Sequence, residues 1–393
     1  MLELIGFVPQ ATLIALVLYN TVTSLWGWPN PAPAPTRGDD RRLRVVIPAH
    51  NEARVLAGVL TDLKASDFPG HLVEVWVIDD RSTDDTGALA ASMGVAVAAR
   101  TDGDGGKGQA LAWYLDNHPL SPDETLVVFD ADNRIPSNTL SRMADEIAAG
   151  HQVVQCYLDV TNPEGSWMAE ASALSYWAGN RMVQLARSNL GWSADLGGTA
   201  MGITAGALEQ AGGFADSLTE DQDLGVRLLL AGHKVEWLHD VRVQDEKPET
   251  LGVAVRQRAR WMAGKRATRR RHLGALLRQG SLACFDMAIR LLQPGRSFMA
   301  LLTVVMIAVA AFTSWTWVFP WQLWATLAVV QVMLPIPFLF RDGVETRHIV
   351  RYPLLAILAA LWLPIRLVSS RVSGWYHTPH TGVTSDDVPD QDL

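Results

Sequence analysis

The chain has 393 residues, a formal net charge of -8 and a hydrophobic fraction of 49%. Its two cysteines, Cys156 and Cys284, are far apart and lack partners at metal-ligand spacing, which excludes a disulfide framework and a zinc site. The apolar excess lies at the two ends of the sequence, which argues against a wholly soluble protein and indicates a soluble middle held by membrane segments.

The first element is an apolar run from Leu4 to Trp26, which has the length that spans a bilayer. A cleaved signal peptide is the alternative, but the run is too long and no basic region precedes it. Several arginines follow the run, so the positive-inside rule places the middle of the chain in the cytoplasm. We expect a transmembrane helix over residues 1–28 and an exposed, Pro-rich linker over 29–42.

From residue 43 to about residue 245, two kinds of segment alternate. Short β-branched runs (LRVVIP, VEVWVID, TLVVFD and QVVQCYLDV) alternate with Ala- and Leu-rich stretches of helical period. This order predicts an α/β domain with a mostly parallel sheet covered by helices on both faces. Functional groups then belong at the carboxyl ends of the strands.

Polar residues follow the first two predicted strands. Pro48 is expected to end the first strand, which places Asn51 and Glu52 at its carboxyl end. Asp79 and Asp80 end the second strand. Each motif alone is compatible with a simple turn or a helix cap. Adjacent acids at a buried strand end repel each other, however, and need a partner such as a ribose hydroxyl or the N–H of a base.

Asp130 and Asp132 flank one small residue after the third apolar run, so their side chains point the same way in extended chain. This arrangement suits a hard divalent cation with oxygen ligands. Because few protein ligands are offered, water and a diphosphate would complete the shell, as Mg²⁺ prefers. Upstream, Lys107 lies in a Gly-rich turn whose spacing does not fit a P-loop, although the lysine is suited to neutralise a phosphate.

Glu220 and Asp221 precede a stretch of helical period, which places them in the first turn of a helix. Acids favour helix N-termini for electrostatic reasons alone. The functional alternative makes one of the two a general base.

The sequence becomes apolar again toward its end. After a basic, amphipathic interfacial region over 265–297, we expect two crossings over 298–340, joined by a tight turn at Pro320 with an aromatic belt of tryptophans around it. Residues 341–380 are predicted to form a cytoplasmic loop, an interfacial helix over 352–372 (or a fourth crossing) and a WYHTPH motif. Residues 381–393 are an acidic tail predicted to be disordered.

In this order, the motifs resemble those of the membrane-integrated family 2 glycosyltransferases, which include the cellulose, chitin, hyaluronan and poly-N-acetylglucosamine synthases. The residues concerned are Asp79-Asp80, Asp130-Ala-Asp132, Thr219-Glu220-Asp221 and Gln257-Arg-Ala-Arg260-Trp261. The likeness covers residues 43–264, together with the membrane layout and the GWYHTPHTG segment. Each motif is weak alone, and the ordered set is specific. The resemblance implies a GT-A fold and inverting hexosyl transfer from a UDP-sugar.

The resemblance also implies a role for individual residues. Asp79 and Asp80 would hold the uridine, Asp130 and Asp132 the nucleotide and a bridging Mg²⁺ or Mn²⁺, and Asp221 would deprotonate the acceptor hydroxyl. The residues expected to contact the nucleotide sugar further include Pro48, Asn51, Glu52, Lys107, Gln257 and Arg260. The expected acceptor-side residues are Gly198, Thr199, Glu220 and Trp261. Lys107, Arg260 and the metal would stabilise the departing diphosphate, with Glu220 and Arg260 counted as catalytic beside Asp221.

The Gln257–Trp261 motif is commonest in chain-forming members, so we expect a polysaccharide product, with addition of one sugar to a lipid as the alternative. Three crossings form little wall for a secretion pore, so a polymer would need a partner subunit or a homo-oligomer. Two departures affect details: Arg81 replaces the usual glycine, and His377 and His380 replace strong cations.

Other classes fit less well. A nucleic-acid patch at KRATRRRH conflicts with the net acidity of the chain and its apolar flanks. A nucleotidyltransferase has no need of the Gln257–Trp261 motif beside a membrane, and a non-catalytic scaffold has no need of the acidic motifs. We therefore expect a multi-pass protein of the cytoplasmic membrane with its catalytic domain in the cytoplasm, in contact with membrane lipids.

Overall fold

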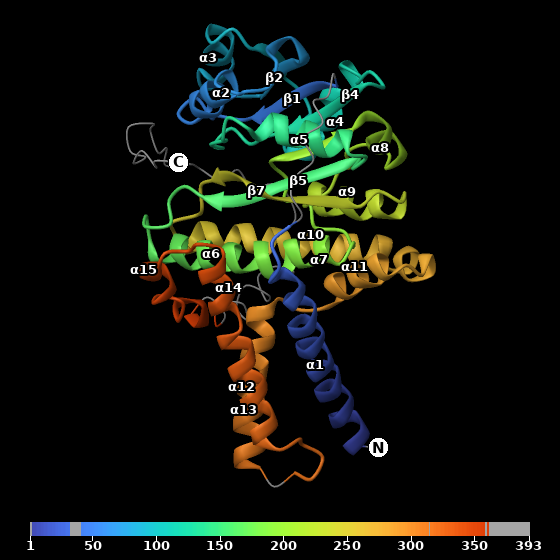
Figure 1. The fold of residues 1–393 in the computed structure, drawn as a ribbon, viewed down its shortest axis with the longest axis vertical. Coiled ribbons are helices and arrows are strands. Elements are labelled where there is room, and N and C mark those ends of the chain that lie inside the picture. The colour runs from blue at the N-terminus through green and yellow to red at the C-terminus, as the bar shows by residue number, and fades with distance from the viewer. Residues whose placement is uncertain (1, 32–40, 314, 358–359, 361–393) are drawn as a thin grey trace.

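The computed structural model describes residues 2–31, 41–313, 315–357 and 360. Figure 1 shows three levels along the longest axis: a sheet with its helices, a layer of helices beneath it, and a stalk that contains α1 and α12–α13. The Trp375–His380 motif, residues 381–393 and most of the Pro-rich linker and of the 352–372 segment lie outside the described residues.

The sheet has seven strands in the order β3-β2-β1-β4-β6-β5-β7. Only β6 runs antiparallel to its neighbours β4 and β5 within this sheet, which confirms a mostly parallel α/β fold. The strands are β1 (Arg42–Ala49), β2 (Val73–Asp80), β3 (Ala96–Arg100), β4 (Glu124–Val128), β5 (Val153–Val160), β6 (Met201–Thr204) and β7 (Val235–Asp245).

Pro48 does not end the first strand as expected, because it lies inside β1 and pairs in register with Ile78 of β2. The ladder between β1 and β4 reaches only Val46 and Val128, and Val46 accepts a bond from Phe129 on that side. Residues 46 and 48 present their backbone groups to the same side of the strand. An N–H at position 48 would therefore point toward β4, beyond the last paired residues of that strand. Because no ladder hydrogen bond is lost there, the sheet tolerates Pro48.

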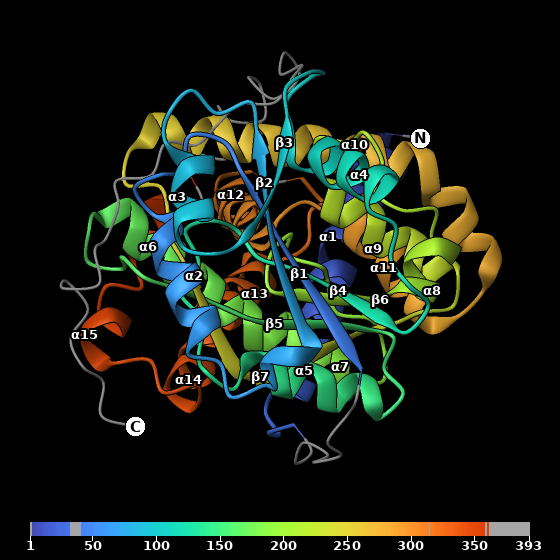
Figure 2. The ribbon, with the colours of Figure 1, turned by 90° about the horizontal axis from the view of Figure 1, so that it is seen from above.

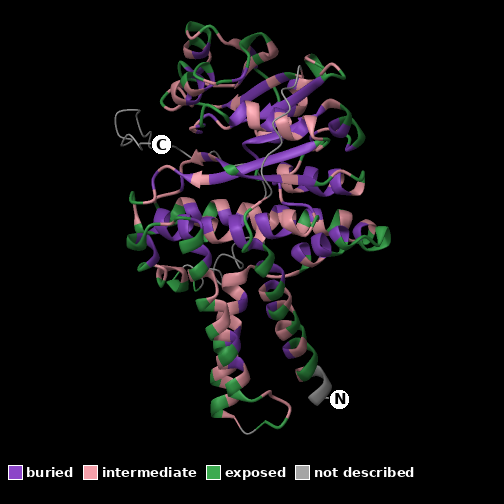
Figure 3. Ribbon diagram, in the orientation of Figure 1, coloured by how far each residue is buried: buried purple, intermediate pink, exposed green. Residues whose placement is uncertain are grey.

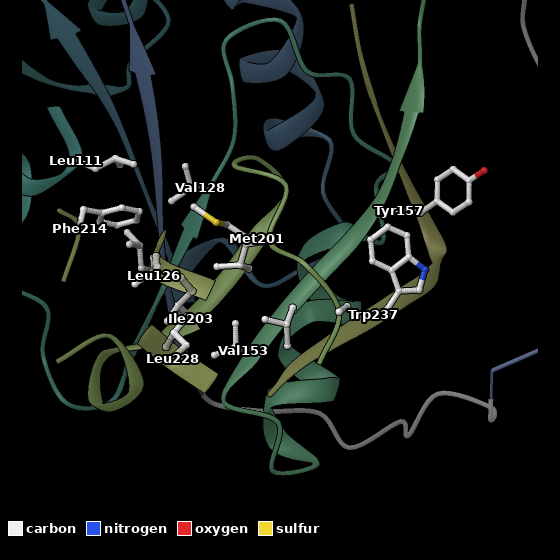
Figure 4. Packing of buried hydrophobic residues seen from close by; sticks show 14 of the residues in the cluster. Leu111, Leu126, Val128, Val153, Tyr157, Met201, Ile203, Phe214, Leu228 and Trp237 are labelled. Carbon is white, nitrogen blue, oxygen red and sulfur yellow. The ribbon is translucent and has the colours of Figure 1, made fainter. Parts of the chain in front are cut away.

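Helices cover both faces of the sheet, as the alternating pattern predicted. Leu126 and Val128 of β4 pack in one buried cluster with Leu111 and Leu228, whereas Val127 packs in a second cluster on the other face. Figure 4 shows the first cluster, and Figure 2 shows helices on either side of the strands. The covering helices are α2 (Leu56–Lys64), α3 (Thr86–Ser92), α4 (Lys107–Asn117), α5 (Thr139–Ala148), α8 (Ala205–Gln210) and α9 (Glu220–Leu230).

The layer beneath the sheet contains α6 (Trp167–Gly179), a π-helical stretch (Asn180–Leu185) and α7 (Ala186–Asn189), which follow one another without a break. It also contains α10 (Leu251–Gln279), a helix of 29 residues, and α11 (Leu282–Leu292). Thr250 begins α10 by accepting a bond from the backbone of Val253, and Gly280 ends it in the left-handed conformation. The predicted interfacial region over 265–297 thus starts inside α10.

Two helical stretches among the described residues are long and apolar enough to cross a membrane: Gly6–Gly27, which contains most of α1 (Leu2–Ser24), and Trp321–Arg341, formed by α13 (Trp321–Met333) and α14 (Pro335–Arg341). A third span is possible only if α11 and α12 (Arg296–Phe312), bent by 62°, count as one. Only 28% and 22% of the two apolar windows are buried, so these surfaces need a partner other than water. Figure 3 shows how few residues of the stalk are buried.

The expected tight turn at Pro320 is a longer connection, because α12 ends at Phe312 and α13 begins at Trp321. The hydroxyl of Thr313 donates to the Val309 carbonyl, and such side chains compete with the helical backbone. Trp324 is fully buried and therefore does not belong to an exposed aromatic belt. After α14, a short α15 (Thr346–Ile349) leads the chain back along α6.

Candidate active site

The carboxyl ends of β1, β2, β4 and β7 open onto one cavity of about 1010 Å³. The first turn of α9, one face of α10, the π-helical stretch and the bend between α11 and α12 complete its wall. Because the cavity extends from the strand ends to the bend that leads into α12, ligands at its two ends would share one space.

Most of the residues singled out in the sequence line this cavity. They are Pro48, Glu52, Asp80, Lys107, Asp130, Asp132, Thr199, Gly198, Glu220, Asp221, Gln257, Arg260 and Trp261. Asn51 and Asp79 are not among the lining residues. Asn51 instead accepts a bond from the Thr83 N–H at 2.7 Å, and the carboxylate of Asp79 accepts one from Ser82. Both side chains hold the loop that follows Asp80 at the end of β2.

Asp80 is only 4% exposed and is neutralised by two arginines. Its Oδ1 lies 3.0 Å from Arg81 Nε and 3.0 Å from Arg100 Nη1. Arg81 adopts a φ of 59°, the left-handed region that favours glycine. The arginine that departs from the family pattern thus keeps the backbone turn of a glycine and adds a charge partner for the buried acid.

Lys107 begins α4 and connects two loops across the cavity floor. Its ammonium contacts the Asp130 carboxylate and donates to the Gly198 carbonyl at 2.8 Å. Asp132 accepts a bond from the Glu246 N–H at 3.1 Å. Lys107, proposed for a phosphate, and Asp130, proposed for a metal, therefore form an ion pair with each other.

A third acid, Asp245, joins this group from the end of β7, and the sequence analysis missed it. Burial, followed by repulsion from Asp132 and Asp130, raises the pKa of Asp245 to about 6, although Lys247 lies 2.6 Å from its Oδ1 and opposes the shift. The available signal was an acid at the end of a strand pattern, here the alternating VRVQD of VRVQDEK.

The acids around Asp130 and Asp132 fit a hard cation only in part. Among the described residues, no group of three or more His, Cys, Asp or Glu side chains is arranged to hold a metal ion. Asp130, Asp132 and Asp245 lie close enough to repel one another, while Lys107 pairs with Asp130 and Lys247 with Asp245. A few carboxylates that do not form a complete cage suit an ion such as Mg²⁺ that keeps waters and is shared with substrate phosphates.

Glu220 and Asp221 lie where the sequence places them, in the first turn of α9, and both line the cavity. Burial and then repulsion by Asp221 raise the pKa of Glu220 to about 7, and burial also raises the pKa of Asp221. Lys107 and Arg260 act in the opposite direction on both acids. A carboxylate whose pKa is moved toward neutrality is suited to accept a proton near physiological pH.

Two glycines let the chain pass close to these acids. A Cβ on Gly198, which has a φ of 83°, would lie 3.3 Å from Asp221 Oδ2, and one on Gly108 would lie 2.7 Å from the Glu220 Cβ. Arg260 approaches from α10, and its Nη1 donates to the Leu218 carbonyl at 2.7 Å. The acid pair is thus enclosed between α4, α10 and the segment before β6.

One face of α10 lines the cavity beyond the predicted motif. Gln257, Arg260 and Trp261 share this face, as their spacing predicted. Lys265, Arg266 and Arg269 follow on the same wall. By contrast, Arg271 and His272 turn away to the buried Asp223, with contacts of 3.3 Å and 2.9 Å. The basic run after Gly264 therefore divides between the cavity and α9, and does not form one membrane-facing patch.

The fold and site define an α/β domain of GT-A type with an acid-lined cavity at its strand ends. The model of the family described as "Glycosyltransferase like family 2" matches residues 41–264, and the chain belongs to this family.

Among curated proteins, the chain is 32% identical over 237 residues to a beta-monoglucosyldiacylglycerol synthase of Nostoc sp., over 56% of this chain and 48% of that protein. It is 30% identical over 243 residues to the probable glucomannan 4-beta-mannosyltransferase 7 of Oryza sativa, over 58% and 41% of the two chains. It thus spans about half the length of these relatives. A solved structure of a Pyrobaculum calidifontis mannosyltransferase in complex with GDP-Man and Mn²⁺ shares the fold, with a TM-score of 0.60 and 19% identity over 91% of this chain and 99% of that one.

Proposed function

We propose that this protein transfers a sugar from a nucleotide donor, most simply a UDP-hexose or UDP-N-acetylhexosamine, to a lipid acceptor at the cytoplasmic face of a membrane. The observation behind this proposal is the single cavity that contains the strand-end acids and also reaches the bend between α11 and α12. The glucosyldiacylglycerol synthases among its relatives support a lipid acceptor. This choice replaces our sequence-based preference for a polysaccharide.

Polymer synthesis remains the second candidate. The Gln257–Trp261 motif and the glucomannan mannosyltransferases among the relatives favour it. Against it, the described helices offer at most three spans to surround a growing chain. A polymer would then require a partner subunit or a homo-oligomer to complete a pore.

In the proposed reaction, Asp221 accepts the proton of the acceptor hydroxyl. The resulting oxygen attacks the anomeric carbon, the bond from that carbon to the diphosphate oxygen breaks, and the nucleoside diphosphate leaves. Lys107 and Arg260 stabilise the charge that develops on the leaving group. Because its pKa is raised to about 7, Glu220 is partly protonated near neutral pH, which weakens its repulsion of the ionised Asp221. A single displacement of this kind inverts the anomeric configuration.

Asp130 and Asp132 are the residues that would hold Mg²⁺ or Mn²⁺, with Asp245 beside them. A bound divalent ion would supply Lewis-acid stabilisation of the departing diphosphate. Trp261, Gly198 and Thr199 line the same cavity, and the Trp261 ring would offer an apolar, flat surface to the acceptor.

The test uses the full-length protein in nanodiscs with membrane lipid, Mg²⁺ or Mn²⁺, and a panel of UDP- and GDP-sugars. Nucleoside diphosphate release is expected with one donor, and Asp221→Asn should lower it by about 10²–10⁴-fold. Asp240→Asn, which changes an exposed acid on β7 away from the cavity, is the matched control. Unchanged turnover in Asp221→Asn, or release of diphosphate in place of the nucleotide, would contradict the proposal. The anomeric configuration of the product tests inversion.

A further inference from the structure

Three cations line the membrane-side part of the cavity. Lys265, Arg266 and Arg269 lie on one face of α10, with spacings of three and four residues that bring their side chains together. They extend beyond Arg260 by one to two and a half helical turns, roughly 8–14 Å along the axis. These cations therefore lie well past the residues assigned to the donor diphosphate.

The same region opens toward the helices of the stalk. Lys265 donates to the Gln293 carbonyl at 3.1 Å, and Asn20 of α1 donates to the Gln293 side chain at 2.7 Å. Gln293 lies in the 62° bend between α11 and α12, where Leu291, Leu292 and Pro294 also line the cavity. A polar, cationic wall therefore meets an apolar rim at this bend.

α11 carries an apolar stripe that the protein leaves uncovered. Leu282, Phe285 and Leu292 are 70%, 55% and 50% exposed, at spacings that keep them near one side of the helix. An exposed apolar stripe on a helix bent away from an apolar span is typical of a helix at the membrane interface. Figure 1 shows α11 in the layer of helices above the stalk, to one side, and α12 within the stalk. At the bend, an exposed apolar surface therefore adjoins the cavity.

The general base lies close to these cations. The backbone of Gly264 presses against Thr219, since a Cβ on this glycine would lie 2.3 Å from the Thr219 hydroxyl. Thr219 precedes Glu220 and Asp221 directly, and Gly264 precedes Lys265. The cations follow Gly264 by one to five residues, roughly 1.5–7.5 Å along the axis of α10. A lipid head group at the bend would therefore meet acids at one end and cations at the other.

We propose that the acceptor is an anionic phospholipid whose phosphodiester binds Lys265, Arg266 and Arg269 while a head-group hydroxyl reaches Asp221. This inference rests on the proposed function and adds the chemical class of the acceptor. The ionised Asp221 repels a phosphate and the three cations attract it, so the charges orient the head group with its hydroxyl toward the base. The hydroxyl loses its proton to Asp221 and bonds to the anomeric carbon, the nucleoside diphosphate leaves, and the phosphodiester stays intact.

Short-chain acceptors separate this recognition from attraction to a charged bilayer. The detergent-solubilised full-length protein is given its active donor and either dihexanoyl phosphatidylglycerol or the neutral dihexanoylglycerol, both as monomers. We expect a kcat/KM ratio well in favour of the phosphorylated acceptor, and a lower ratio in high salt. Arg269→Gln should lower the ratio about tenfold, which corresponds to roughly 1.4 kcal/mol. Arg269→Lys, which keeps the charge, should retain most of it.

Arg270→Gln is the matched control, because Arg270 is an exposed neighbour that does not line the cavity. Lys265→Gln is a second test variant in case Arg269→Gln lowers the unfolding temperature. The anionic-lipid assignment is overturned if the neutral acceptor is used equally well or better. It is also overturned if Arg269→Gln and Arg270→Gln have equal effects on the kcat/KM ratio. Either result leaves the proposed function intact. No sugar transfer from any donor to either lipid overturns the proposed function itself, and this inference with it.

Discussion

The contact between Gly264 and Thr219 makes a sharp prediction about the catalytic acids. In Gly264→Ala, the new Cβ would lie 2.3 Å from the Thr219 hydroxyl, 2.6 Å from its methyl carbon and 2.9 Å from its Cβ. Ordinary contact needs at least 3.4 Å, so Thr219 must move by about 1 Å. Thr219 is the residue before α9, and its displacement moves the turn that holds Glu220 and Asp221.

The expected loss is larger in activity than in stability. Overpacking of this kind costs about 1–3 kcal/mol. The higher helix propensity of alanine offsets up to about 1 kcal/mol of that cost. A misplacement of about 1 Å at a catalytic group lowers turnover by about 10²-fold. Gly264→Ala should therefore fold, unfold at a modestly lower temperature, and lose most of its kcat.

Two further variants isolate the cause. Gly274→Ala lies in the same helix with only the end of the Arg278 side chain near its new Cβ, so it should be active and slightly more stable. Thr219→Ala removes two of the three contacting atoms, and the Thr219 hydroxyl has no hydrogen-bond partner among the described residues. Adding Thr219→Ala to Gly264→Ala should restore part of the turnover. Wild-type kcat/KM in Gly264→Ala, with thermal unfolding like that of Gly274→Ala, would refute this reasoning.

Three other predictions concern pH, the buried ion network and the metal. Glu220 has a pKa raised from 4.5 to about 7, so the stability that its protonated form confers is fully present below about pH 4.5 and is lost as pH rises through 7. Glu220→Gln should therefore stabilise the protein more at pH 8 than at pH 5, by up to about 3 kcal/mol in the free energy of unfolding. Thermal unfolding at the two pH values measures this difference, and an equal effect at both contradicts the prediction. Asp286 is fully buried and contacts Tyr19 on α1 and Arg187. Asp286→Ala leaves a buried cation unpaired and should lower the free energy of unfolding by about 3–5 kcal/mol. Tyr19→Phe removes one hydrogen bond and should lower it by only about 1 kcal/mol, as thermal unfolding would show. A chelator should abolish nucleotide release and Mn²⁺ restore it, and Asp132→Asn should raise the Mn²⁺ concentration for half-activation at least about tenfold; activity that persists in the chelator would remove the metal from the proposal.

The sequence was sufficient wherever local pattern and burial coincide. The runs that became β1, β2, β4 and β5 are apolar and β-branched, and the acids after three of them were found for that reason. The first turn of α9 and the shared face of Gln257, Arg260 and Trp261 follow from helical spacing alone.

Other elements lacked a local signal. β3 reads AVAAR and β6 reads MGIT, and alanine, glycine and short length give neither a strand pattern nor a direction. The antiparallel place of β6 between β4 and β5 depends on which surfaces pack together, and no residue in the strand encodes it. Pro48 was misjudged because its tolerance depends on where β4 stops pairing, a property of another strand.

The sequence by itself determined that this protein has a parallel α/β domain, acids at its strand ends and apolar helical segments, because strand and helix periodicity and the length of apolar runs are local properties. Only the tertiary structure decided which charges meet. It brought Asp245 to Asp130 and Asp132, set Gly264 against Thr219, and divided one basic run so that Lys265, Arg266 and Arg269 line a cavity while Arg271 and His272 bind Asp223. These contacts join residues far apart in the chain, and their position depends on how whole helices pack, which no short stretch of sequence specifies.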